Sequence, residues 1–127
     1  QSYFDNRLTL INGDSSIELK TVLENLNEPA CFWLDAHSGA QQYAKGHQDV
    51  PLLTELDHIK NHHIKGHVIA IDDAHLFGKK QYDKTGNIVC DYSHVTFDVV
   101  KQKILEIDQS YDVGLYAPYD MQMVLAI

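Results

Sequence analysis

The sequence predicts an α/β fold with a mostly parallel sheet that ends in an antiparallel hairpin. Short apolar runs alternate along the chain with segments of helical period, the order expected of strands joined by crossover helices. Two of these runs, residues 30–34 and 68–71, are continuously apolar, which is typical of strands covered on both faces. The last two apolar segments are joined by a short turn, so they are expected to pair antiparallel.

Length and charge restrict the kind of protein this can be. The 127 residues are enough for one hydrophobic core, so we predict a single domain over residues 1–127. A net charge of -8 disfavours nucleic-acid binding, which needs clustered Lys and Arg, and is compatible with cation binding. No apolar run approaches the roughly 20 residues of a membrane span, so no membrane partner is expected. Cys31 and Cys90 do not have the spacing of a thiolate metal site, and a disulfide scaffold is not expected either, so we predict a reducing, cytoplasmic setting. Cys31 lies within an apolar run and is expected to be buried.

The first predicted strand covers residues 7–12, where polar and apolar side chains alternate. A helix is expected next, because Ser15 and Glu18 have the spacing of a capping box. Leucine and valine side chains then recur at helical period until Pro29 breaks the pattern. The second strand is the apolar run 30–34.

The middle of the chain is predicted to contain a loop, a helix, a strand and a second loop. Residues 36–48 lack periodicity and contain glycine, so they are expected to be a loop. Pro51 fits the first turn of a helix with a leucine-rich stripe, and Gly66 fits its end. The strand 68–71 follows, and the polar residues 78–92 are predicted to be a surface loop.

The closing part is predicted to hold one more helix and the hairpin. Thr96 can cap a helix that carries apolar side chains at positions 97, 100, 104 and 107. Residues 111–117 and 121–127 are the two hairpin strands, and residues 118–120 are the turn between them.

Acidic side chains directly follow two of the predicted strands. Asp35 follows residues 30–34, and Asp72 and Asp73 follow residues 68–71. Because ligands of open α/β sheets bind beyond the carboxyl ends of the strands, we expect these three carboxylates in one crevice. Their repulsion raises their pKa values unless a cation lies between them, and Mg²⁺ or Ca²⁺ prefers such oxygen ligands. We therefore predict a divalent-cation site; the alternative is that these residues are helix caps or are simply solvated.

Histidines follow the same two strands. His37 and His75 each lie two residues after an aspartate, and a histidine beside a cation-bound hydroxyl can act as a general base near neutral pH. His37 is therefore the predicted catalytic residue. Either histidine can instead bind a softer metal such as Zn²⁺, Mn²⁺ or Fe²⁺, or be an ordinary loop residue. The remaining histidines of the second helix, His58, His62 and His63, are interpreted as a polar face.

The turn between the first strand and the first helix is a candidate ligand contact. Gly13 permits a tight turn, and the first amides of the helix point toward the crevice. Asp14 can accept a hydrogen bond from an amino group of a ligand. Gly13, Asp14 and Ser15 also fit an ordinary helix cap, so this motif alone distinguishes nothing.

In this order, the segments resemble the second half of a class I S-adenosylmethionine-dependent methyltransferase. Residues 7–15 resemble the segment that contacts the adenine, and residues 30–37 resemble the fourth strand with its Asp. Residues 68–73 resemble the fifth strand, and residues 111–127 resemble the closing hairpin. The resemblance covers nearly the whole chain and implies a Rossmann-like sheet.

More narrowly, Asp35 with Asp72 and Asp73 is similar to the metal triad of cation-dependent O-methyltransferases of the catechol and the macrocin or novobiose type. The resemblance implies a metal-assisted O-methyltransferase acting on a hydroxyl of a small molecule or sugar. His37 lies where that family has its general base, although the family has Lys or Asp there. The resemblance also implies S-adenosylmethionine contacts from Gly13, Asp14, Ser15 and Asp35.

Two parts of that family's pattern have no counterpart here. The glycine-rich turn after the first strand and the acidic residue that closes the second are absent from the sequence. We therefore expect the first two strands to be missing, with about 80 residues belonging to a parent protein, and poor cofactor binding by this chain alone. An alternative is a non-catalytic methyltransferase-like domain that binds a partner or helps a larger enzyme to fold. A binuclear metallohydrolase, suggested by Asp35 and His37, is disfavoured because Gly39 stands where a further Asp is needed.

Overall fold

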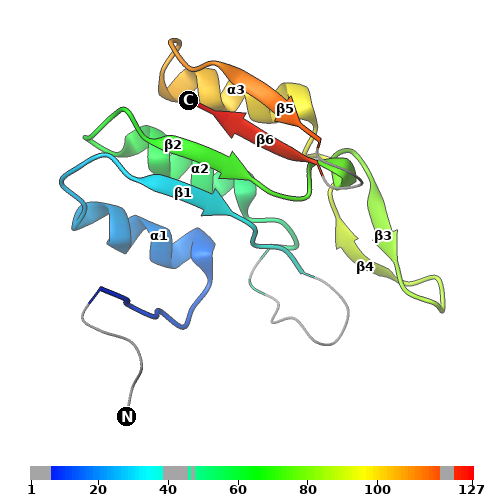
Figure 1. Ribbon diagram of the computed structural model, residues 1–127. Helices are drawn as coiled ribbons and strands as arrows, with labels where there is room; N and C mark the ends of the chain where they lie inside the picture. Colours follow the sequence, from blue (N-terminus) through cyan, green and yellow to red (C-terminus); the bar gives the residue numbers. More distant parts are fainter. Residues whose placement is uncertain (1–6, 39–45, 47, 118–121) are drawn as a thin grey trace.

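The computed structural model describes residues 7–38, 46, 48–117 and 122–127 and has an α/β fold (Figure 1). Its main sheet has the order β1-β2-β6-β5, from β1 (Cys31–Leu34), β2 (Val68–Ile71), β6 (Met123–Ala126) and β5 (Val113–Tyr116). β1 and β2 are parallel, whereas β6 is antiparallel to both β2 and β5. The predicted α/β class and the closing hairpin are confirmed. The prediction of a mostly parallel sheet is wrong, because β1–β2 is the single parallel pairing of this sheet within the described ranges.

Three helices pack together beside this sheet, with α2 between the other two (Figure 1). They are α1 (Ser15–Glu24), α2 (Leu52–Asn61) and α3 (Phe97–Ile107), each in a predicted place. The amide of Val99 donates to the Thr96 hydroxyl at 3.2 Å, which confirms the predicted cap of α3. α1 is capped by Asp14 rather than by Ser15. None of the helices in the described part of the chain is long and apolar enough to cross a membrane.

The hydrophobic core lies between the helices and one face of the sheet. Alternate strand side chains point into it, and each large aliphatic side chain that is fully buried contributes about 1.5–3 kcal/mol. The core includes Phe32, Leu34, Ile69, Ile71 and Val124 of the strands and Leu56, Ile59, Val100 and Ile104 of the helices.

The opposite face of β1 is open to solvent, which corrects the predicted burial on both faces. Cys31 is exposed, and the side chain of Trp33 is 59% exposed. The continuous apolar run misled the prediction because β1 is an edge strand, and no helix in the described ranges covers its outer face. A strand that buries only one face requires apolar side chains only at alternate positions.

Residues 7–12 do not form the predicted strand, because they pair with no strand of the described chain. Leu10 is 80% exposed and Ile11 is 54% exposed. An alternating sequence becomes a strand only where a neighbour supplies hydrogen-bond partners and a surface to pack on.

Residues 78–92, predicted as a surface loop, contain a two-stranded sheet of β3 (Lys80–Tyr82) and β4 (Ile88–Asp91). The turn between them is held by Asp83, whose Oδ1 accepts from the amides of Thr85 at 2.8 Å and Asn87 at 2.9 Å. β4 leads directly to Tyr92, which is buried. A short 3₁₀ helix, η1 (Ala74–Leu76), follows β2. The predicted turn 118–120 and most of the predicted loop 36–48 lie outside the described residues.

Candidate metal centre

The carboxyl ends of β1 and β2 lie side by side, as predicted. Leu34 is paired with Ile71 in the parallel ladder, and the amide of Asp72 donates to the Leu34 carbonyl at 3.0 Å. Asp35 and Asp72 therefore leave the sheet at the same edge. This pairing brings acidic side chains from two distant parts of the chain together.

The group of side chains that can hold one metal ion is Asp35, His37 and Asp73. Each offers a ligand atom, and these atoms all lie within 4.8 Å of one another. Asp72, the third predicted ligand, is not in this group, and its Oδ1 accepts a hydrogen bond from the amide of Asp73 at 2.8 Å. The structure thus groups two of the three predicted metal ligands with the histidine that was predicted as a base.

The orientation of His37 directs its Nε2 toward Asp73. Its Nδ1 lies 2.7 Å from the Ser38 carbonyl, which can only accept, so Nδ1 carries the hydrogen. In the neutral ring, Nε2 then has a lone pair, and it lies 3.1 Å from Oδ2 of Asp73. Two acceptors face each other there unless a proton or cation joins them. Metal-binding histidines characteristically donate their other N–H to a backbone carbonyl or carboxylate.

Ser38 fixes the backbone that carries this histidine. Its amide donates to the Asp49 carbonyl at 2.6 Å, and its hydroxyl donates to the Val89 carbonyl at 3.0 Å. Ser38 is only 4% exposed. The β3–β4 hairpin, which the sequence did not reveal, therefore supports the loop after β1.

The surroundings of Asp35 disfavour its charged form. Burial raises the pKa of Asp35, and the neighbouring charges of Asp72 and Asp73 raise it further, while His37 lowers it. This is the direction expected for carboxylates that converge without a cation between them. A bound cation would remove that repulsion.

Asp73 has a left-handed backbone conformation, with φ of 58°, a region where Asp and Asn are enriched among non-glycine residues. Its Oδ1 lies 4.0 Å from Nε2 of His75. His75 lies beside the metal group but is not part of it. Nδ1 of His75 is buried and has no hydrogen-bond partner within the described ranges.

Tyr92 is a site residue that sequence reasoning missed. It is 3% exposed, and burial raises its pKa, with further contributions from Cys90 and from the three aspartates. Its hydroxyl therefore stays protonated and can donate a hydrogen bond beside the carboxylates. It was missed because it was assigned to a surface loop. The signal that could have found it is the apolar Val-Cys pair just before Asp-Tyr, which is typical of a strand leading into the core.

The predicted cofactor turn begins α1 at the same end of the molecule as the carboxyl end of β1 (Figure 1). Oδ1 of Asp14 accepts from the amide and the hydroxyl of Ser16 at 2.9 and 2.6 Å. A Cβ added at Gly13 would lie 2.5 Å from the Glu18 side chain, so this glycine allows a close approach. Gly13 and Asp14 thus serve the helix cap, and Asp14 is not in the metal group.

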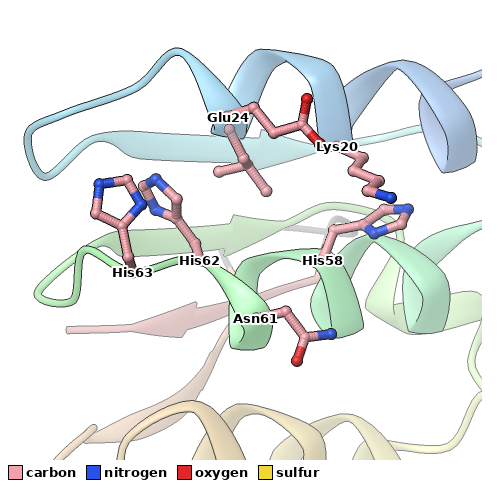
Figure 2. Close-up of a pocket in the computed structure, with 7 residues that line it drawn as sticks. Lys20, Glu24, His58, Asn61, His62 and His63 are labelled. Atoms are coloured by element: carbon pink, nitrogen blue, oxygen red, sulfur yellow. The ribbon is translucent and has the colours of Figure 1, made fainter.

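A pocket of about 420 Å³ lies between α1 and α2, away from these strand ends (Figure 2). Its polar lining comprises Lys20, Glu24, His58, Asn61, His62 and His63. The polar-face interpretation is wrong for His62, which is 5% exposed, and fits His63, which is exposed. Nε2 of His58 lies 2.7 Å from the Ser16 carbonyl, a contact that joins the two helices.

Comparisons with protein-family models, with curated proteins and with solved structures gave no match.

Proposed function

We propose that this chain is the cation-binding, carboxyl-terminal part of a metal-assisted, S-adenosylmethionine-dependent O-methyltransferase that acts on a hydroxyl of a small molecule or sugar. The main support is the group of Asp35, His37 and Asp73 beyond two parallel strands, with ligand atoms within 4.8 Å. The order of segments along the chain, which resembles that enzyme class, supports the choice of reaction.

The three residues would hold the ion through two carboxylates and one imidazole. The residues fit a cation for two reasons. Nδ1 of His37 donates to the Ser38 carbonyl, which leaves Nε2 as the possible ligand atom, and the carboxylates of Asp35 and Asp73 repel each other. A nitrogen donor beside two oxygens favours Mn²⁺, Fe²⁺ or Zn²⁺ over Ca²⁺, whereas Mg²⁺ would bind mainly through the carboxylates. We propose that His37 is a ligand in this state, in place of the general-base role expected from sequence.

Bound there, a divalent cation would orient a substrate hydroxyl and lower its pKa. In the reaction the substrate oxygen forms a bond to the methyl carbon while the methyl–sulfur bond breaks, and the hydroxyl proton passes to solvent. The protein contributes mainly by holding the reacting groups in line. The residues proposed to face the cofactor are Gly13, Asp14, Ser15 and Asp35, and the remaining contacts would come from a parent protein.

Calorimetry with Mn²⁺ tests the site without knowledge of the substrate. Asp73→Asn should weaken Mn²⁺ binding at least about 10-fold, because it removes a charged ligand, and Asn tolerates the left-handed backbone. Asp112→Asn is the matched control, since Asp112 is exposed near β5. Equal affinity of Asp73→Asn and wild type would refute the cation site.

His37→Phe separates the two roles considered for this histidine. The substitution keeps a ring and removes both nitrogens. A ligand role predicts weaker Mn²⁺ binding, whereas a base role predicts unchanged binding and slower methyl transfer by the parent enzyme. Activity that persists unchanged in a chelator would exclude the metal role altogether.

The second candidate function is a non-catalytic methyltransferase-like domain. The uncovered sheet face favours it, because Trp33 is 59% and Tyr116 is 58% exposed there, and large exposed apolar patches commonly mark contact surfaces. Calorimetry of the parent protein with S-adenosylmethionine distinguishes the two, since a non-catalytic domain should show no binding.

A further inference from the structure

Glu55 is a carboxylate in the first turn of α2 with 2% of its surface exposed. It is the most buried acidic residue of the described chain. Its position could have been read from sequence, because it lies three residues after Leu52 and four before Ile59, on the apolar stripe of the helix. Acidic residues are almost never fully buried unless they are paired.

The pairing of Glu55 is incomplete. Oε2 has no hydrogen-bond partner among the residues that the structure describes. Burial raises the pKa of Glu55, a hydrogen bond with the Ser15 side chain opposes this effect, and the charge of Asp14 reinforces it. A buried oxygen without a partner destabilises the fold, so its retention calls for an explanation.

Glu55 also lines a small cavity that reaches the carboxyl ends of β1 and β2. Asp35, Asp72 and Tyr92 line the same cavity, and most of its other lining residues are apolar. Its volume of about 10 Å³ is roughly the space that one water molecule needs. The cavity therefore connects Glu55 with Asp35 of the metal group through a space for a single small polar group.

We propose that Glu55 is a positioning residue of the cation site: a water molecule bound to the cation occupies this cavity and donates a hydrogen bond to Oε2 of Glu55. The inference rests on the proposed cation site. Mg²⁺ and similar ions keep several waters when they bind protein carboxylates. A hydrogen bond from such a water to a carboxylate is charge-assisted, and outer partners of this kind strengthen metal binding.

Mn²⁺ titration of three variants of this 127-residue chain tests this role. Glu55→Gln should weaken Mn²⁺ affinity about 10-fold, because the charge-assisted hydrogen bond is lost. Glu28→Gln is the matched control, since Glu28 is exposed at the other end of β1; it removes an equal charge and should leave the affinity within twofold of wild type. Asp73→Asn reports on the cation site itself.

Two further readouts exclude a merely structural role for Glu55. Because burial disfavours its charged form, Glu55→Gln in a chelator should melt at or above the wild-type temperature at pH 7. In Glu55→Leu saturated with Mn²⁺, the relaxation of bulk water protons per bound ion should increase, because the water at this coordination position is no longer held in the cavity and exchanges freely with solvent.

The outcomes separate the two proposals. Loss of binding in Asp73→Asn together with equal affinities of Glu55→Gln and Glu28→Gln refutes the role of Glu55 and leaves the cation site standing. Wild-type affinity in Asp73→Asn refutes the cation site and the Glu55 proposal with it. Weak binding by Glu55→Gln that accompanies a lowered melting temperature also overturns the positioning role, because the fold would then explain the loss.

Discussion

The two ends of the parallel pair β1–β2 both carry histidines, yet their polar atoms have opposite surroundings. Before the strands, His62 and His67 have each ring nitrogen in a hydrogen bond. After the strands, Nε2 of His37 lies 3.1 Å from Oδ2 of Asp73, whereas Nδ1 of His75 is buried and has no partner among the described residues. Satisfied buried groups hold a fold together, whereas unsatisfied ones mark sites that a ligand completes.

The hydrogen bonds at the amino ends fix a single proton arrangement. The Ala30 amide donates to Nδ1 of His67 at 3.0 Å, so Nε2 of His67 must carry the hydrogen that it donates to Nδ1 of His62 at 2.9 Å. Nε2 of His62 then donates to the Leu26 carbonyl at 2.9 Å. Both rings are neutral in this arrangement, and they join the end of α1 to the start of both strands.

The largest expected effect on stability comes from removing His67 from this hydrogen-bond network. His67→Ala leaves the Ala30 amide and Nδ1 of His62 without partners and opens a cavity, so it should lower the free energy of unfolding by about 3 kcal/mol. Urea unfolding measures the change. His63→Ala, at an exposed neighbour, should stay within about 0.5 kcal/mol of wild type. Similar losses in both variants would show that the network contributes little.

Acid should also lower the free energy of unfolding through His67, by a smaller amount. Burial lowers the pKa of His67, and the nearby His62 lowers it further. Below the ordinary histidine pKa of about 6.5, the unfolded chain therefore binds the proton more readily than the folded one. Stability is then complete above that pH and declines as the pH falls toward the folded-state pKa, by up to about 1.4 kcal/mol for each pH unit. Unfolding curves between pH 5 and 7.5 measure the slope. His67→Gln should flatten it, and an unchanged slope would assign the effect to other groups.

The smallest effect on stability is expected from neutralising Asp35, one of the carboxylates that converge after the strands. The pKa of Asp35 is raised, so its charged form is disfavoured in the folded state at neutral pH, and Asp35→Asn should raise stability slightly in a chelator. Asp35 is exposed, so the gain should be below about 1 kcal/mol. With Mn²⁺ present, the wild type should be more stable than Asp35→Asn, because only the wild type is stabilised by binding the ion. Thermal melts with and without Mn²⁺ show both, and a variant that still gains from Mn²⁺ would contradict the ligand role.

Much of the fold follows from periodicity in the sequence. α2, α3, β1 and β2 were predicted because their apolar side chains recur at the helix or strand period. The β3–β4 hairpin was missed because its turn is held by the Asp83 side chain and its strands carry few buried side chains. Residues 7–12 show the converse, since their alternating pattern finds no neighbour in the described chain.

The part of the site that lies at the ends of strands could be predicted from the sequence. Asp35 and Asp73 follow apolar runs directly, so their convergence could be expected. The exclusion of Asp72 from the metal group depends on its hydrogen bond to the next amide, which is a local backbone detail. The burial of Tyr92 and the open oxygen of Glu55 arise from packing between distant segments, which no local pattern specifies.

The outer face of β1 also supplies a built-in optical reporter. Trp33 is the single tryptophan of the sequence, and 59% of its side chain is exposed on that face. Its fluorescence therefore comes from one known position, should emit at long wavelength and should be quenched readily by iodide. Any molecule that covers this face would shift the emission to shorter wavelength and protect it from the quencher, without a label being added to the chain.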